Sequence, residues 1–287
     1  MSRSVIQERN LLSLRLSALP APGFRKMFPD SPANLTPGEN MHHHNSFAIV
    51  IRVREFGESD LLVTFFTPDR GTLKGVAKGG RKSRKRFPNC LDLLCLTKVA
   101  YTTRRNKDLC FLNSCELIHG FPGLRSDFTS LVLASHMAEL SETLFPQNVP
   151  GKEIFDLLNQ SFLALDRGKD KDIIRIVFEA KAMALAGYGI NFEKCCHCGR
   201  PYTGTGRAIF CREKGAISCL RCRQESVGFP GMAPGTAKKM IEIQKEPVAV
   251  ISGMELDEEA VREIKPVLRL HIAYRIGRPS RSVRYLE

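Results

Sequence analysis

Between residues 46 and 119, apolar residues recur at every second position, which is the pattern of a β-strand with one buried face. Five such stretches occur, at residues 47–54, 61–66, 72–77, 91–101 and 109–119. Turn signals rich in Gly, Asp and Ser separate the first three of them. Five short strands in so short a segment leave little room for helices. The pattern therefore predicts a small β-barrel, with an OB-fold as the leading candidate.

From about residue 126 to 188 the apolar spacing changes to three and four, the period of one helix face. Two helices are expected from the sets Leu133, Met137, Leu140 and Leu144, and Ile154, Leu158, Phe162 and Leu165. A third is expected from Asp170 to about Gly187, with acids at its positive end. Residues 261–272 predict a last helical stretch, broken or restarted at Pro266, after a linker at 230–234. We expect these apolar faces to form the core of a helical unit.

Two Cys-x-x-Cys pairs lie between the third and last predicted helices. They are Cys195 with Cys198 and Cys219 with Cys222, and the spacer between the pairs is 20 residues, which suits a zinc site. Two such pairs present four thiolates to one tetrahedral ion, and four thiolates leave no open coordination position. The spacing therefore predicts one structural Zn²⁺ ion held by these four residues.

Other cysteines leave alternatives open at this site. Cys196, His197 and Cys211 are rival ligands, although Cys196 stands too close to Cys198 to replace Cys195 easily. The sequence leaves open whether Cys211 replaces one of the four ligands. A pair of disulfides, or free thiols, is the alternative to any metal. The four remaining cysteines lie in apolar stretches and are expected to be buried thiols.

The net charge of +13, from 43 Lys and Arg against 30 Asp and Glu, favours an anionic partner. No acid occurs between Asp69 and Asp92. The candidate nucleic-acid-binding residues there are Lys74, Lys78, Arg81, Lys82, Arg84, Lys85 and Arg86, extended by Arg104, Arg105 and Lys107 on a neighbouring predicted turn. A solvated basic turn is the alternative. On an OB-fold, the binding of single strands is favoured.

Partners for base stacking are less clear from the sequence. Phe65, Phe66, Phe87 and Tyr101 are candidates, but each is expected to belong to the core. The basic tail at residues 271–282 suits either a DNA contact or a solvated helix end.

Several activities lack their motifs in this chain. It has no Gly-x4-Gly-Lys-Ser/Thr phosphate loop and no His-x-Glu before the cysteine pairs, so neither ATP hydrolysis nor zinc-dependent deamination is expected. The triplet Glu263-Ile264-Lys265 matches only a loose fragment of a nuclease motif. No apolar run approaches the roughly 20 residues of a membrane helix. We therefore expect a soluble binding protein and no enzyme.

Three stretches together resemble one family, the RecO recombination mediators. They are IRVREFGESDLLVTFFTPDRGTLKGVAKGGRKSRKRF, the pair CCHCG and GAISCLRC, and HIAYRIGRPSRS. They resemble that family's opening barrel, its zinc knuckles and its closing segment, in the family's order from Ser46 to Leu286. Some members lack the cysteines, whereas all four are present here.

The resemblance implies an α+β chain with an N-terminal OB-fold barrel, followed by an α-helical domain with an inserted four-cysteine zinc module. It implies binding of single- and double-stranded DNA, annealing of complementary strands, and loading of RecA onto SSB-coated strands together with RecR. It also implies contact with the C-terminal tail of SSB, and a place at the nucleoid in the bacterial cytoplasm.

The expected domains are residues 46–120 for the barrel and 121–287 for the helical domain, with the zinc module at about 192–228. Residues 1–45 have no counterpart in the family pattern and are expected to be a disordered extension or a start codon placed too early. From the residues alone, an RNA-binding factor with an OB-fold and a zinc ribbon remains the alternative.

Overall fold

The structure is a computed structural model that describes residues 41–104, 108–251, 253–277 and Ser282. All of them belong to one unit of the chain, Asn40–Glu287. Most of the expected extension, residues 1–40, lies outside the described residues, as do Arg105 and Lys107. Among the helices of the described part, none combines the length and apolar character needed to cross a membrane.

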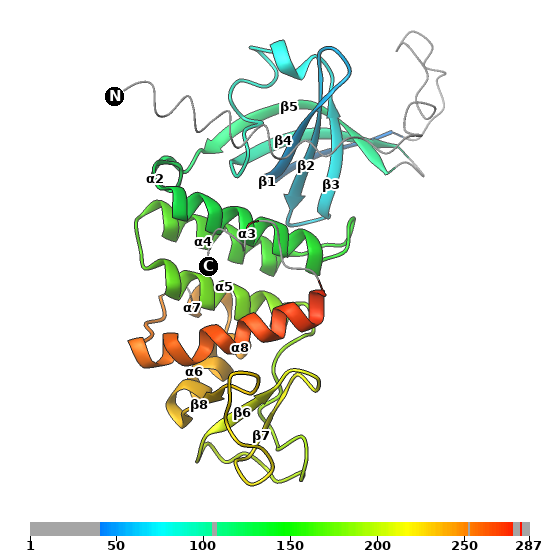
Figure 1. The fold of residues 1–287 in the computed structure, drawn as a ribbon. Coiled ribbons are helices and arrows are strands. Elements are labelled where there is room, and N and C mark those ends of the chain that lie inside the picture. The colour runs from blue at the N-terminus through cyan, green and yellow to red at the C-terminus, as the bar shows by residue number, and fades with distance from the viewer. Residues whose placement is uncertain (1–40, 105–107, 252, 278–281, 283–287) are drawn as a thin grey trace. The chain divides into compact units, whose positions relative to one another are not determined.

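The first five strands close into a barrel in the order β1-β2-β3-β5-β4 (Figure 1). They are β1 Met41–Phe56, β2 Asp60–Thr67, β3 Gly71–Ala77, β4 Leu96–Arg104 and β5 Leu109–His119. Neighbours are antiparallel except β3 and β5, which pair in parallel. This is the closed five-stranded arrangement expected of an OB-fold, so the predicted fold class is confirmed.

Two boundaries in the barrel differ from those predicted. β1 begins at Met41, before the start of the first strand predicted at residue 47. The residues before Ser46 are mostly polar and carry no alternation, but their backbone pairs with β4, where His43 opposes Thr102. β4 begins at Leu96 and not at residue 91, because Leu94 takes a positive φ of 62° that interrupts an extended chain.

The helical part contains α2 Pro122–Ser126, α3 Phe128–Leu144, α4 Lys152–Asp166, α5 Lys171–Leu185, α6 Pro234–Lys245, α7 Val248–Ile251 and α8 Glu258–Ile276 (Figure 1). The prediction that Pro266 breaks the last helix is wrong, since α8 runs through it. Ile264, Val267 and Leu268 are buried on either side of this proline. Packing of that apolar face against the core therefore holds the helix together where local propensity would end it.

Barrel and helices share apolar contacts. Ile49, Ile51 and Phe66 belong to the same buried cluster as the residues of α3 and α4. The Phe66 ring stacks on Phe155 of α4, with 6.4 Å between centroids. Arg52 of β1 forms an ion pair with Glu142 of α3 at 2.7 Å. These residues of β1 and β2 therefore pack the barrel against α3 and α4.

A small sheet is inserted between α5 and α6. It consists of β6 Ala208–Cys211, β7 Ala216–Ser218 and β8 Gly231–Met232 in the order β7-β6-β8 (Figure 1). The segment 230–234, expected to be a linker, contains β8, because Ala208 pairs with Met232. Phe210, Ile217 and Met232 are buried in the core of the helical part. The inserted sheet is therefore anchored to the helices by apolar side chains.

A capping aspartate links the starts of two helices, and its removal should destabilise the helical part. The Asp127 carboxylate accepts a hydrogen bond from the Ser130 N–H at 2.7 Å and lies 3.0 Å from the Lys171 ammonium. Hydrogen bonds from Ser130 and the contact with Lys171 lower the pKa of Asp127 to about 2. We expect Asp127→Ala to lower the free energy of unfolding by about 1 kcal/mol near neutral pH.

The pH dependence follows from the sign of this shift. Because the folded pKa is depressed, the carboxylate stabilises the fold fully above about pH 4 and loses that effect as the pH falls towards 2. Urea denaturation of wild type and Asp127→Ala at about pH 7 and pH 3 measures the difference. Asp127→Asn keeps a capping oxygen and should lose less. An equal loss for both variants at every pH would contradict the assignment.

Candidate metal centre and nucleic-acid interface

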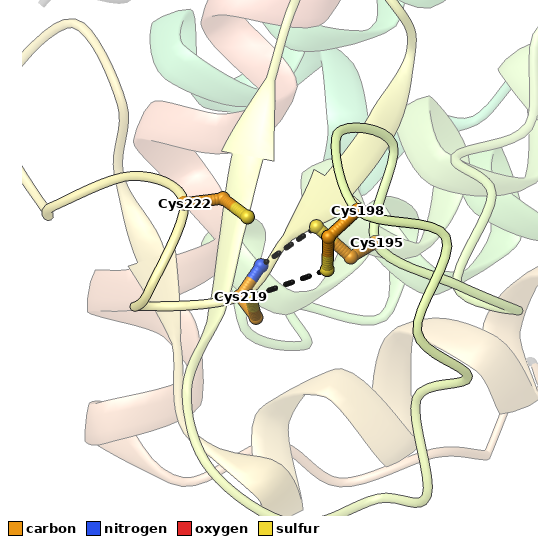
Figure 2. A group of neighbouring side chains, drawn as sticks. All are labelled: Cys195, Cys198, Cys219 and Cys222. Carbon is orange, nitrogen blue, oxygen red and sulfur yellow. Dashed lines mark hydrogen bonds between the residues drawn. The ribbon is translucent and has the colours of Figure 1, made fainter.

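The four predicted cysteine ligands come together at one end of the inserted sheet. Cys195 and Cys198 lie in the loop after α5, Cys219 directly follows β7, and Cys222 is one turn further (Figure 2). Their Sγ atoms all lie within 4.8 Å of one another, and those of Cys198 and Cys219 are 3.9 Å apart. A zinc ion with bonds of about 2.3 Å to sulfur needs tetrahedral edges of about 3.8 Å. The cluster therefore has the size and the donor atoms that a structural metal ion requires.

Backbone hydrogen bonds shape both cysteine turns. The Gly199 N–H donates to the Cys195 carbonyl at 3.0 Å, and Gly199 has a φ of +71° that a side chain would strain. In the second turn, the Cys222 N–H donates to the Cys219 carbonyl at 3.0 Å. The Cys219 N–H also points at the Cys195 sulfur at 3.4 Å (Figure 2). The thiols are thus positioned by local backbone geometry before any ion binds.

The cluster also favours a thiolate. Burial opposes ionisation of Cys195, but hydrogen bonds from the backbone N–H groups of Cys198, Cys219 and His197 outweigh it and lower the pKa of Cys195 to about 5. Hydrogen bonds with Cys219 and Cys198 raise the pKa of Cys222 to about 12. A metal ion would displace the remaining protons.

The rival ligands form a second group. The ligand atoms of Cys196, His197 and Cys211 lie within 4.8 Å of one another, and the Cys211 sulfur is 3.8 Å from His197 Nε2. Cys211 therefore lies with Cys196 and His197 and not with the four paired cysteines. The expectation that the other cysteines are buried thiols is confirmed for Cys90, Cys95, Cys110 and Cys115.

Ion pairs tie the cysteine-bearing segment to the helices. Arg207 forms a two-bond pair with Glu225, at 2.8 and 3.0 Å, and contacts Glu263 of α8 at 2.9 Å. Glu263 in turn accepts a hydrogen bond from the Ala233 N–H at the start of α6. These contacts thus connect the position of the cysteine-bearing segment to α6 and α8.

The basic segment between β3 and β4 divides into two groups. Arg81 pairs with Glu55 at 3.1 Å, and Arg86 donates to the Lys78 carbonyl while its guanidinium lies over the Phe87 ring. Lys82, Arg84 and Lys85 are exposed and form no ion pair with any residue that the structure describes. These last three side chains are therefore the ones most available to phosphates.

Three other predicted cations lie on strands β3 and β4 or in the turn directly after β3. Lys74 is half-buried on β3, Lys78 is exposed directly after β3, and Arg104 ends β4. Because β5 lies between β3 and β4, Lys78 and Arg104 flank one β5 residue, Phe111. Sequence analysis missed Phe111, although its outward place in an alternating strand beside a basic turn was a usable signal. In the C-terminal tail, Arg278 and Arg281 lie outside the described residues.

The aromatic residues considered for stacking are in the core, as expected. Phe65, Phe66 and Tyr101 are at most 1% exposed, and Phe87 is 5% exposed. None of these rings can reach a ligand without rearrangement of the barrel.

A pocket of about 300 Å³ opens in the helical part, between α4, α5 and the residues after α7. Leu157, Ile173, Ile251 and Met254 contribute apolar walls, and the charged lining residues are Lys169, Asp170 and Glu255. Because one lysine and two acids line it, the pocket suits an apolar group and gives no net attraction to an anion.

Comparison with known proteins gives one consistent family. The model for the N-terminal part of recombination protein O matches residues 41–121, and the model for its C-terminal part matches residues 125–284. DNA repair protein RecO of Syntrophus aciditrophicus is 30% identical over 252 residues, covering 85% of this chain and 95% of that protein. DNA repair protein RecO of Desulfatibacillum aliphaticivorans is 32% identical over 244 residues, which cover 84% of this chain and 95% of that protein.

Proposed function

This chain belongs to the RecO family of DNA repair and recombination proteins, and from that premise we propose that it is a mediator that acts by binding alone. It binds single- and double-stranded DNA, anneals complementary strands, and helps RecR load RecA onto SSB-coated single strands. The observation that carries this proposal is the exposed group Lys82, Arg84 and Lys85 on the barrel. These cations suit phosphate binding whatever the base sequence, as a mediator requires.

Annealing follows from the electrostatics of two strands. Two phosphate backbones repel each other, and cations held between them lower that repulsion and release counterions. The net charge of +13 adds a long-range attraction to either strand. No nucleotide hydrolysis is needed for such a step.

We assign the four-cysteine cluster to one Zn²⁺ ion with a structural role. Cys195, Cys198, Cys219 and Cys222 supply four sulfur ligands, and zinc is the ion most often found in such a set. Bound there, the ion supplies a crosslink between the two cysteine turns. The chain's own residues then carry that rigidity to α8 through Arg207 and Glu263.

The partners follow from the family and from the helical part. We propose RecR and the C-terminal tail of SSB as direct partners and RecA as an indirect one. The pocket between α4 and α5 is the candidate place for that tail because of its apolar walls. The proposed place of action is the nucleoid, since DNA is the ligand.

The decisive experiment is annealing of complementary DNA strands coated with SSB, with and without RecR and without ATP. We expect annealing by this protein on wild-type SSB and much less on SSB that lacks its C-terminal tail. Ile173→Asp in the pocket should produce the same loss on coated strands while leaving annealing of bare strands unchanged. Absence of annealing on bare DNA would reject the proposal. Tighter binding to RNA than to DNA in competition would favour the RNA-binding alternative.

A further inference from the structure

Phe111 occupies an outward position in the middle of three adjacent strands. It opposes Val76 of β3 on one side and Thr102 of β4 on the other. Its neighbours Cys110 and Leu112 are buried inside the barrel at 3% exposure, so the Phe111 side chain is on the outer face. Phe111 itself is half-buried. The ring is therefore partly accessible, unlike the buried aromatics of the barrel core.

Two cations lie over this ring, one from the turn after β3 and one from the end of β4. The Lys78 ammonium is 5.6 Å from the ring centroid, and the Arg104 guanidinium is 5.1 Å from it. A row of polar side chains continues across the same face: the Asn113 amide donates to the Thr102 hydroxyl at 2.8 Å, and His43 Nδ1 is 3.1 Å from that hydroxyl. An aromatic ring between two cations, beside a polar row, matches the components of a strand of nucleic acid: bases, phosphates and sugars.

We propose that Phe111 is a stacking platform for one base of single-stranded DNA, with Lys78 and Arg104 binding the phosphates on either side of that base. This inference rests on the proposed DNA binding and names the face and the ring that would carry it. Single-stranded DNA is favoured over duplex because the bases of a duplex are already stacked on one another. Every base has a π-face, so stacking on Phe111 is independent of sequence.

The alternative is that the two cations simply cover a surface phenylalanine. Lys78 is exposed and its side chain is long and flexible, whereas Arg104 is half-buried. A cation above an exposed ring is held weakly, and a phosphate attracts it more strongly than the ring does. When a strand arrives, Lys78 can move to one of its phosphates and leave its place above the ring to a base.

The chain contains no tryptophan, which allows a direct optical test. In Phe111→Trp the new indole is the single tryptophan fluorophore, and a stacked base should quench it. We expect quenching by an oligo(dT) of about 16 nucleotides and none by an abasic strand with the same number of phosphates. The matched control is Phe128→Trp, an exposed position on α3 that should respond to neither strand. Equal quenching by the abasic strand would overturn the stacking role.

Affinity gives a second, independent measurement. Phe111→Ala should weaken oligo(dT) binding about tenfold with an unchanged salt slope, whereas Phe111→Tyr should bind like wild type. On the abasic strand and on duplex DNA, Phe111→Ala and wild type should agree within about twofold. Thermal unfolding of each variant shows whether the barrel is intact, and Phe111→Tyr covers the case in which alanine disrupts it.

The outcomes separate this inference from the function it rests on. If wild type binds no DNA, the proposed function fails. If wild type binds oligo(dT) and loss of the exposed loop cations weakens it, but Phe111→Ala binds as tightly as wild type, only the stacking platform is rejected. An equal loss on oligo(dT) and the abasic strand would likewise reject it, since bases would then make no contribution.

Discussion

Cys219→Ser is expected to remove the single zinc ion from the protein and to loosen the two cysteine turns that the ion links. Four sulfur ligands lie within 4.8 Å of one another, and replacing one leaves a three-ligand site with a solvent-filled position. Metal binding at structural zinc sites contributes a large part of the folding free energy of small modules. We expect a loss of about 3 kcal/mol or more, or roughly 10 °C in Tm, with zinc content falling from one ion per chain to none.

Three measurements check this result. Elemental analysis gives the zinc content, thermal unfolding gives Tm, and limited proteolysis should show new cleavage between Cys195 and Cys222. Cys211→Ser is the matched control, because Cys211 lies in the other group with Cys196 and His197. It should retain the ion. Loss of zinc in Cys211→Ser, or a zinc-free wild type, would contradict the assignment of ligands.

The loss of stability in Cys219→Ser should be confined to the cysteine-bearing segment and the helices that it contacts. Arg207 and its partners Glu225 and Glu263 connect the cysteine segment to α8. The barrel has its own buried cluster, formed by residues such as Phe65 and Tyr101. Affinity of Cys219→Ser for oligo(dT) should therefore remain close to that of wild type. A large loss of DNA affinity would mean that the cysteine segment contributes directly to binding.

The second large effect concerns the exposed cations of the basic segment. Replacing Lys82, Arg84 and Lys85 together by alanine should weaken binding to oligo(dT) on the order of tenfold to a hundredfold at low salt, because a phosphate without a protein cation keeps its condensed counterions. The plot of log affinity against log salt should become shallower by about 0.7 for each cation removed, or by about 2 for all three. Anisotropy titrations at four or more salt concentrations measure this slope.

A control must separate local phosphate binding from net charge. A triple variant with Lys152→Ala, Lys238→Ala and Arg262→Ala also removes three positive charges, from exposed positions on α4, α6 and α8. That variant should keep most of the wild-type slope of log affinity against log salt concentration. Arg81→Ala should also have a smaller effect, because Arg81 is engaged by Glu55 at 3.1 Å. Equal slopes for the two triple variants would remove the basic segment from the binding site.

Local patterns in the sequence were sufficient for much of this protein. Apolar alternation predicted β2, β3 and β5 because a strand's inward and outward positions follow directly from backbone geometry. Helical spacing predicted α3, α4 and α5 for the same kind of reason. The two Cys-x-x-Cys pairs predicted the cysteine cluster, because each pair forms one tight turn whose shape is set by adjacent residues.

The remaining features depend on residues far apart in the chain, and only the tertiary structure decided them. The polar start of β1 is a strand because β4 pairs with it, and α8 continues through Pro266 because its apolar face is buried. Cys211 joins Cys196 and not the four paired cysteines because β6 carries it to that side. Phe111 lies near Lys78 and Arg104 only because β5 lies between β3 and β4. Closure of the barrel creates this strand order, and no local sequence pattern predicts it.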